Sequence, residues 1–216
     1  MRSSRSASGR PCSSWDRLRS SYDQVAHRYD DRFRHELDGK PRDRELLDAF
    51  AASAADPVVD VGSGPGQIGA YVRARGRRVI GADLSPEMAA LAGERLDGAV
   101  ACDLRALPLA TASVGGVIAF YSLIHLRRGE LPDGLQELAR VLRPGGQLLC
   151  SVHEGHGEIV TDEFLGEPVP FAATFFSLEE LVDATTGAGL TVTVAEQRSP
   201  YPTESSTTRV YVQAER

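Results

Sequence analysis

The sequence predicts a doubly wound α/β fold, in which helices cover both faces of a mostly parallel β-sheet. Short apolar segments, partly β-branched, recur at regular intervals, and segments with helical periodicity lie between them. Near the end of the chain, two strand-like segments are joined by a loop rich in Pro, Ser and Thr, with no helix between them. This pattern indicates an antiparallel hairpin beside the parallel strands. We therefore expect a Rossmann-like sheet of seven strands with an antiparallel last strand, preceded by an N-terminal helical cap.

Seven segments have the apolar, partly β-branched composition of buried strands. They cover residues 57–61, 78–82, 99–102, 115–121, 147–152, 190–195 and 208–214. Helical patterns cover residues 67–75, 87–96, 133–142 and 177–188. Gly76 and Pro144 stand just after the first and third of these patterns, where glycine and proline commonly end a helix.

The chain divides into a tail, a cap and a core. Residues 1–14 are rich in Ser, Arg and Gly, and we expect a disordered tail because chain ends are often loose. Residues 15–51 show helical spacing with a break at 38–41, which predicts a helical cap or lid. Residues 52–216 form the predicted core. Within it, residues 154–176 are an insertion after the fifth strand, whose four phenylalanines either line an acceptor pocket or pack as local core.

The composition argues against several classes of function. A chain of 216 residues builds one sizeable core with a small cap. Its formal net charge of −6 argues against a protein that wraps nucleic acid, and no apolar segment approaches the roughly 20 residues of a membrane span. The three cysteines are scattered without a CxxC pair, so we expect no disulfide framework, and a reducing cytoplasm fits best. We expect no metal site, because His153 and His156 lack the spacing of a zinc-binding helix.

The most informative motif is a glycine-rich turn at residues 62–66, directly after the first predicted strand. Such a turn lets backbone approach a nucleotide-like ligand and opens a helix whose first N–H groups are free. Gly64, Gly66 and Gly69 also match the dinucleotide pattern G-x-G-x-x-G, so an NAD(P)-dependent oxidoreductase is an alternative. Asp60 favours another ligand. Its carboxylate would crowd a pyrophosphate, whereas it can help to hold a cationic amino-acid group, directly or through water.

Acidic residues also follow the second and third predicted strands. Asp83 stands at the end of the second, where a carboxylate can accept hydrogen bonds from both ribose hydroxyls. Ser85, ahead of Pro86, already suits the N-cap of the next helix, which leaves Asp83 free for a ligand. Asp103 follows the third strand, where it either accepts a hydrogen bond from an adenine amino group or is an ordinary turn aspartate.

This succession of motifs resembles the class I S-adenosylmethionine-dependent methyltransferases. The resemblance rests on four features in order: residues 58–66, then Asp83, then Asp103 with residues 107–109, and finally residues 142–146 ahead of the fifth strand. It implies S-adenosylmethionine as cofactor and S-adenosylhomocysteine as product.

The resemblance also implies roles for individual residues. Gly62, Gly64 and Gly66 would pass close to the methionine part, Asp83 would hold the ribose, Asp103 the adenine amino group, and Leu104 the adenine ring through its backbone N–H. Residues 22–30 resemble the N-terminal lid helix of small-molecule members, so Tyr22 and Tyr29 either close over the cofactor or belong to ordinary core packing. Residues beside these motifs are expected to complete the cofactor site: Asp60, Ser63, Leu84, Met88, Cys102 and Tyr121.

Methyl transfer from a sulfonium is an in-line displacement, in which the protein mainly aligns the acceptor and excludes water. A general base is needed where the acceptor is protonated at neutral pH. Two histidines follow predicted strand ends, His125 after the fourth and His153 after the fifth, and either can serve as that base. His125 also stands where the family often has a structural histidine.

The acceptor is expected to be a small molecule. After the fourth strand the chain has residues 120–123, Phe-Tyr-Ser-Leu, where amino-methylating nucleic-acid enzymes carry an Asn/Asp-Pro-Pro-aromatic run. We therefore predict methylation of an oxygen or nitrogen of a small-molecule acceptor, such as a specialised metabolite, without a nucleic-acid or membrane partner. The alternatives are an NAD(P)-dependent oxidoreductase and a non-catalytic S-adenosylmethionine-binding protein.

Overall fold

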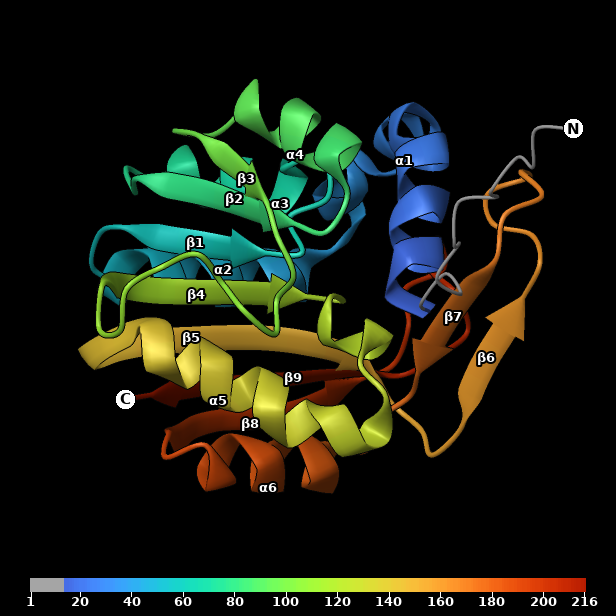
Figure 1. Ribbon diagram of the computed structural model, residues 1–216. Helices are drawn as coiled ribbons and strands as arrows, with labels where there is room; N and C mark the ends of the chain where they lie inside the picture. The colour runs from blue at the N-terminus through green and yellow to red at the C-terminus, as the bar shows by residue number, and fades with distance from the viewer. Residues whose placement is uncertain (1–13) are drawn as a thin grey trace, which may run out of the picture.

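The computed structural model describes residues 14–216, and in this part of the chain a seven-stranded sheet is flanked by helices on both faces (Figure 1). The tail expected at residues 1–14 lies outside the described residues, except for Ser14, which begins the first helix. The α-helices are α1 (Ser14–Phe33), α2 (Pro41–Ser53), α3 (Gln67–Arg73), α4 (Pro86–Gly93), α5 (Leu131–Val141) and α6 (Leu178–Gly187). Short 3₁₀ helices are η1 (Glu36–Gly39), η2 (Leu123–His125) and η3 (Arg128–Glu130).

The large sheet has the strand order β3-β2-β1-β4-β5-β9-β8. Its strands are β1 (Val58–Val61), β2 (Val79–Asp83), β3 (Ala99–Ala101), β4 (Val114–Phe120), β5 (Leu142–His153), β8 (Thr191–Arg198) and β9 (Arg209–Glu215). The last strand, β9, is antiparallel to both of its neighbours, and the first five strands are parallel to one another. The predicted sheet is therefore confirmed. The strand order reverses between β1 and β4, and in doubly wound sheets ligands bind at the carboxyl ends of the strands at this point.

Two apolar layers hold the helices against the sheet. Leu47 and Phe50 of α2 and Val72 of α3 pack on one face, whereas Leu135 of α5 and Leu181 of α6 pack on the other. The strands β1 and β4 between these layers are buried along their whole length, which explains why they are almost continuously apolar.

The predicted helical cap is formed by α1, η1 and α2, with the expected break at residues 38–41. In Figure 1, α1 stands across the carboxyl ends of the parallel strands. Asp30 of α1 accepts hydrogen bonds of 2.7 and 2.8 Å from the guanidinium of Arg95, which follows α4 in the sequence. Asp23 accepts one of 2.5 Å from the Ser85 hydroxyl. The helix α1 is thus fixed to residues on either side of α4 by charge-assisted hydrogen bonds.

Residues 154–176 contain a feature that the sequence prediction missed. They form a separate two-stranded sheet, β6 (Glu158–Thr161) and β7 (Phe171–Thr174), which lies beside α1 (Figure 1). The strand β5 also begins five residues earlier than expected, because Leu142 pairs with Val114 ahead of a bulge. Residues 143–146 contain Pro and two Gly, which are typical of a loop, and they form the irregular stretch between the paired residues Leu142 and Gln147.

Candidate functional site

A cavity with about 660 Å³ of empty space, part of it open to solvent, lies at the carboxyl ends of β1, β2 and β4 beneath α1. Its lining combines apolar, aromatic and a few polar residues, as is usual for small-molecule sites. The described residues that line it are Trp15, Leu18, Tyr22, Tyr29, Gly62, Gly64, Ala82, Asp83, Leu84, Met88, Cys102, Leu104, Leu107, Phe120, Tyr121, Ser122 and His125. Most of the cofactor contacts predicted from the sequence are therefore gathered around one cavity.

The glycine turn between β1 and α3 lines the cavity with Gly62 and Gly64. Gly62 has φ +68°, and a side chain there would place its Cβ only 2.2 Å from Cβ of Ser122, at the end of β4. Gly64 has φ +52°, and its N–H donates a 2.8 Å hydrogen bond to Oδ2 of Asp83. Both positions therefore require glycine, because of the left-handed backbone and, at Gly62, because of the close crossing of two strand ends.

Asp83 is held in place by backbone donors. Its Oδ2 accepts from Gly64 and its Oδ1 accepts a 2.8 Å hydrogen bond from the N–H of Ser85. Ser85 caps α4 as predicted, because its hydroxyl accepts from the N–H of Met88 at 3.1 Å. Burial raises the pKa of Asp83 to about 6, against the lowering effect of these N–H donors. The carboxylate thus faces the cavity with fixed orientation and remaining lone pairs for a ligand's hydroxyl groups.

Four predicted cofactor residues lie outside the lining of the cavity, and their roles stay predictions. Asp60 is buried behind the turn, where its Oδ2 accepts a 2.9 Å hydrogen bond from the N–H of Gly69 in the first turn of α3, and burial raises its pKa to about 7. Ser63 is buried in the turn, and Gly66 packs closely against α4. Asp103 forms an ion pair with Arg105, with a closest N–O distance of 2.6 Å. Contacts within the fold thus occupy the carboxylates of Asp60 and Asp103.

The cap brings two tyrosines and one predicted base together. Tyr22 and Tyr29 of α1 both line the cavity, with ring centroids 6.1 Å apart. The Tyr22 hydroxyl lies 2.8 Å from Nε2 of His125, and Nδ1 of His125 lies 3.0 Å from the carbonyl oxygen of Ala172. Burial lowers the pKa of His125 to about 4, so its imidazole is neutral near pH 7.

The other predicted base, His153, is placed differently. Its ring stacks on Tyr121, with centroids 4.9 Å apart, and its Nδ1 lies 2.8 Å from the Thr207 hydroxyl. Tyr121 lies at the cavity, whereas His153 is outside the described lining. Burial, together with the positive charges of Arg209 and Lys40, lowers the pKa of His153 to about 4. The structure thus brings His125 to the cavity and separates His153 from it by one aromatic ring.

Comparison with known proteins agrees with this geometry. The family model described as a methyltransferase domain matches residues 59–150. The crystal structure of a 1,6-didemethyltoxoflavin-N1-methyltransferase from Burkholderia thailandensis superimposes with a TM-score of 0.70 and 26% sequence identity, over 92% of this chain and 86% of that one. These matches support a class I S-adenosylmethionine-dependent methyltransferase family for this chain.

Curated methyltransferases match this chain over shorter stretches. A malonyl-[acyl-carrier protein] O-methyltransferase from Enterobacter lignolyticus is 41% identical over 93 residues, which are 42% of this chain and 36% of the relative. An uncharacterized methyltransferase from Geobacillus kaustophilus is 27% identical over 132 residues, 60% of each chain. This chain therefore spans between 36% and 60% of the length of these two relatives.

Several residues of this cavity were missed by sequence reasoning: Trp15, Leu18, Ala82, Leu107, Phe120 and Ser122. Trp15, Leu18 and Tyr22 are spaced by three and four residues, so they share one face of α1, and this spacing was available in the sequence. Phe120 and Ser122 flank Tyr121 at the end of β4, and only their position at the strand end brings them to the cavity.

Tyr121 itself has an unusual backbone. Its φ is +57°, a left-handed conformation that costs about 1–3 kcal/mol in a non-glycine residue. Lys40 Nζ and Arg209 Cζ lie 5.5 and 5.9 Å from the centroid of its ring, and His153 stacks on it. These contacts hold the ring in place at the wall of the cavity.

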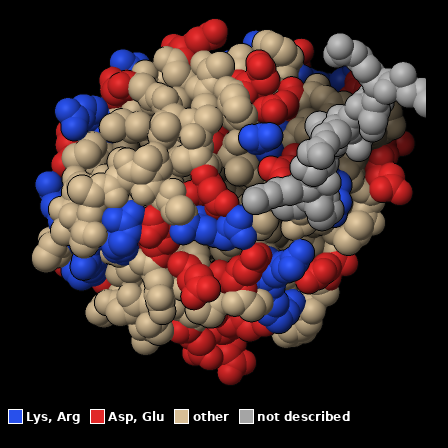
Figure 2. Space-filling view, viewed as in Figure 1, with Lys and Arg blue, Asp and Glu red and all other residues tan. Residues whose placement is uncertain are grey.

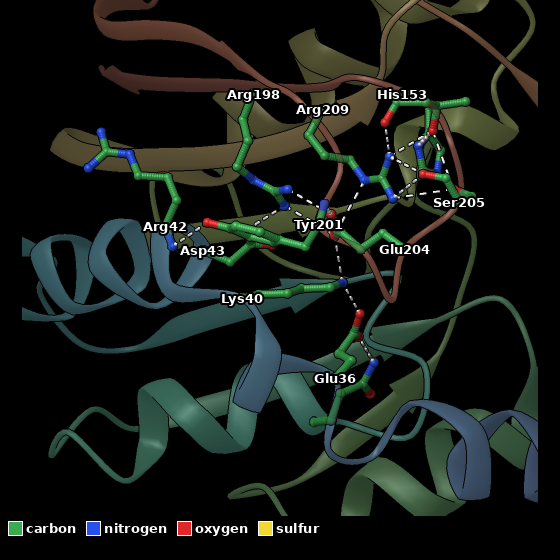
Figure 3. Close-up of polar contacts among 12 residues, drawn as sticks. Glu36, Lys40, Arg42, Asp43, His153, Arg198, Tyr201, Glu204, Ser205 and Arg209 are labelled. Carbon is green, nitrogen blue, oxygen red and sulfur yellow. Dashed lines mark hydrogen bonds and ion pairs between the residues drawn. The ribbon is translucent and has the colours of Figure 1, made fainter.

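The two cations near Tyr121 belong to a buried ionic network that joins the cap to the β8–β9 hairpin (Figure 3). Its centre is Glu204, whose side chain is 3% exposed and which accepts from Arg198 at 2.6 Å and from the backbone N–H of Tyr201 at 2.8 Å. Lys40 lies 3.5 Å and Arg209 3.6 Å from the same carboxylate. Burial alone would raise the pKa of Glu204, but these donors and cations lower it to about 2.

Among residues 14–216, no group of three or more His, Cys, Asp or Glu side chains is placed to hold a metal ion. In the same part of the chain, the helices are too short or too polar to cross a membrane.

Proposed function

We propose that the protein transfers the methyl group of S-adenosylmethionine to an oxygen or nitrogen of a small-molecule acceptor, such as a specialised metabolite. The observation that carries this proposal is the meeting of the side-chain-free turn at Gly62 and Gly64 with the fixed carboxylate of Asp83, at one end of one cavity. The match to a methyltransferase domain and the similarity to a methyltransferase solved with S-adenosylhomocysteine support it.

The residues of the cavity fit the cofactor part by part. Asp83 has the charge and the orientation to accept hydrogen bonds from two ribose hydroxyls. Leu84, Met88, Leu104 and Leu107 offer an apolar slot for the flat adenine base. The turn at residues 62–64 lets backbone approach the methionine part. The predicted contact of Asp103 with the adenine amino group would require its carboxylate to be shared with Arg105.

When bound, the cofactor supplies a methyl group that is already activated by its sulfonium. The chain's own residues then align the acceptor and exclude water, to which α1 contributes Tyr22 and Tyr29. A protonated acceptor also needs a base near the reacting atom. Of the two predicted bases we favour His125, because it lines the cavity, and we assign His153 to the support of Tyr121.

A small acceptor is favoured over a nucleic acid or an acidic carrier protein. On the face shown in Figure 2, basic and acidic side chains are interspersed, without the continuous basic patch that a polyanion requires. The formal net charge of −6 also disfavours a polyanionic acceptor. Some relatives act on larger acceptors, as their names state: an acyl-carrier protein for one and a tRNA for a mouse protein that is 35% identical over 114 residues.

Isothermal titration calorimetry with S-adenosylhomocysteine tests the cofactor assignment. We expect saturable one-site binding of S-adenosylhomocysteine and no heat of binding with NAD⁺ or NADP⁺. The reverse result would replace the proposal by a dinucleotide-dependent oxidoreductase. Incubation with methyl-labelled S-adenosylmethionine and a metabolite extract then tests catalysis. Binding without any labelled product would favour the non-catalytic alternative.

A further inference from the structure

Tyr22 and His125 form a hydrogen-bonded pair at the wall of the cavity. The two residues are far apart in the sequence and come from α1 and η2, yet the Tyr22 oxygen and His125 Nε2 lie 2.8 Å apart. Both side chains line the cavity. A third element completes the chain of hydrogen bonds, because Nδ1 of His125 lies 3.0 Å from the carbonyl oxygen of Ala172 in β7.

The direction of these hydrogen bonds follows from the chemistry of the groups. A carbonyl oxygen only accepts, so the proton of the neutral imidazole is on Nδ1. Nε2 then carries a lone pair, and the Tyr22 hydroxyl must donate to it. The lone pairs of the Tyr22 oxygen remain free to accept a hydrogen bond from a molecule in the cavity. Tyr22 therefore stands between the cavity and the nitrogen lone pair of His125.

Aromatic side chains surround this pair. Phe164 lies edge-to-face against Tyr22 and Phe171 against His125, each with centroids 5.7 Å apart, and these two phenylalanines stack on each other at 4.4 Å. The Ser21 hydroxyl donates a 2.7 Å hydrogen bond to the carbonyl of Pro170, and this bond ties the segment between β6 and β7 to α1. The wall behind the pair is thus apolar, and on the cavity side Trp15, Phe120 and Tyr121 provide flat surfaces suited to an aromatic ring.

Building on the proposed function, we propose that Tyr22 is a catalytic residue that relays a proton from the acceptor to His125, and that the acceptor is a hydroxylated aromatic ring. The acceptor hydroxyl donates a hydrogen bond to the Tyr22 oxygen, and its ring lies among the aromatic walls of the cavity. His125 acts through Tyr22 as the terminal base, and the Ala172 carbonyl orients its ring.

The relay balances in atoms and in charge. As the acceptor oxygen forms its bond to the methyl carbon, the sulfur–carbon bond breaks and its electron pair stays on sulfur. The acceptor's proton passes to the Tyr22 oxygen while the Tyr22 proton passes to Nε2 of His125. The site exchanges the positive charge of the sulfonium for that of an imidazolium, so its net charge is unchanged. Burial and the charge of Asp83 raise the pKa of Tyr22, so this side chain keeps a proton before and after the step.

Two probes of different acidity test the relay. Phenol retains its proton at about pH 8, whereas 4-nitrophenol is largely ionised and needs no base. Methylation of each probe is followed with methyl-labelled S-adenosylmethionine for the wild type, Tyr22→Phe and His125→Asn. We expect both variants to slow phenol methylation about 10²-fold or more while 4-nitrophenol is methylated at nearly the wild-type rate.

Tyr71→Phe is the control, because Tyr71 lies on α3 away from the cavity, and it should leave both rates unchanged. Equal slowing of both probes by Tyr22→Phe would show a purely structural role and overturn the relay. Wild-type rates with both probes would remove Tyr22 from the chemistry. Binding of S-adenosylhomocysteine without methylation of either phenol would refute the acceptor class alone. Absence of that binding would instead refute the proposed function.

Discussion

Replacement of Asp83 by asparagine should weaken S-adenosylhomocysteine binding and remove most of its pH dependence. The aspartate accepts 2.8 Å hydrogen bonds from Gly64 and Ser85 and keeps lone pairs for two ribose hydroxyls. Asparagine preserves the shape of the side chain but carries no charge, and it replaces one acceptor oxygen by a donor. One backbone N–H of the pair would therefore lose its partner as well.

The expected magnitude follows from these contacts. Loss of charge-assisted hydrogen bonds to the ribose costs about 1.5–3 kcal/mol of binding free energy, whereas the unpaired N–H is present in both the free and the bound protein and lowers only the stability of the fold. We expect the dissociation constant to rise by about one to two orders of magnitude, since about 1.4 kcal/mol corresponds to a factor of ten. Calorimetric titration of the wild type, Asp83→Asn and Asp133→Asn measures the change. Asp133 lies in the first turn of α5, and its substitution is the matched control.

The pH dependence provides a second, independent measurement. The pKa of Asp83 is raised to about 6, and ribose hydroxyls favour the ionised carboxylate, so wild-type affinity should fall as pH drops below that value, by about tenfold per unit. The folding stability of the free protein depends on pH in the opposite direction. Because the pKa of Asp83 is raised in the folded state, this residue contributes stability at low pH that is lost as pH rises through about 6. Unchanged affinity in Asp83→Asn, or an equally steep pH dependence in that variant, would refute the ribose assignment.

Three further predictions concern the turn, the acid behind it and the buried network. Gly62→Ala should abolish binding of S-adenosylhomocysteine, because the added Cβ would meet Ser122. Gly76 is also left-handed, but no described atom lies within 4 Å of a Cβ built there. Gly76→Ala should therefore lower only the free energy of unfolding, by about 1–2 kcal/mol. Asp60→Asn should flatten the decline of the melting temperature that wild type shows as pH rises through about 7, because the folded pKa of Asp60 lies above its unfolded value; an unchanged decline would contradict this. Glu204→Gln should lower the free energy of unfolding in urea by about 3–5 kcal/mol, because it leaves buried cations unpaired. The control Glu45→Gln, at an exposed ion pair, should lower it by about 0–1 kcal/mol. Similar values for the two variants would rule out a structural role for the network.

Much of the fold could be predicted because its signals are local. Strands buried on both faces are continuously apolar, helices end at glycine or proline, and consecutive segments alternate between the two. The hairpin β6–β7 was missed because Glu158–Thr161 is short and exposed, without the apolar alternation of a half-buried strand. The start of β5 was placed too late because Pro144 and its glycines form an irregular stretch, and the pairing of Leu142 with Val114 ahead of it has no local signal in the sequence.

The candidate site was predictable where ligand contacts come from strand ends. Parallel strands end at one edge of the sheet, so the turn at Gly62 and Gly64 and the acid at Asp83 had to meet once the strand order was known. Sequence reasoning could not separate His125 from His153, because both follow strand ends and only the packing of Tyr121 between His153 and the cavity distinguishes them.

By itself, the sequence determined the sheet, the glycine turn and the acids at the strand ends, because backbone preferences and hydrophobic periodicity act over a few residues. Only the tertiary structure decided which side chains meet. The pairing of Tyr22 with His125 and the contacts of Lys40 with Glu204 and with the Tyr121 ring join segments more than 80 residues apart. Such contacts depend on how helices and loops pack over the sheet, and no local pattern in the chain encodes that geometry.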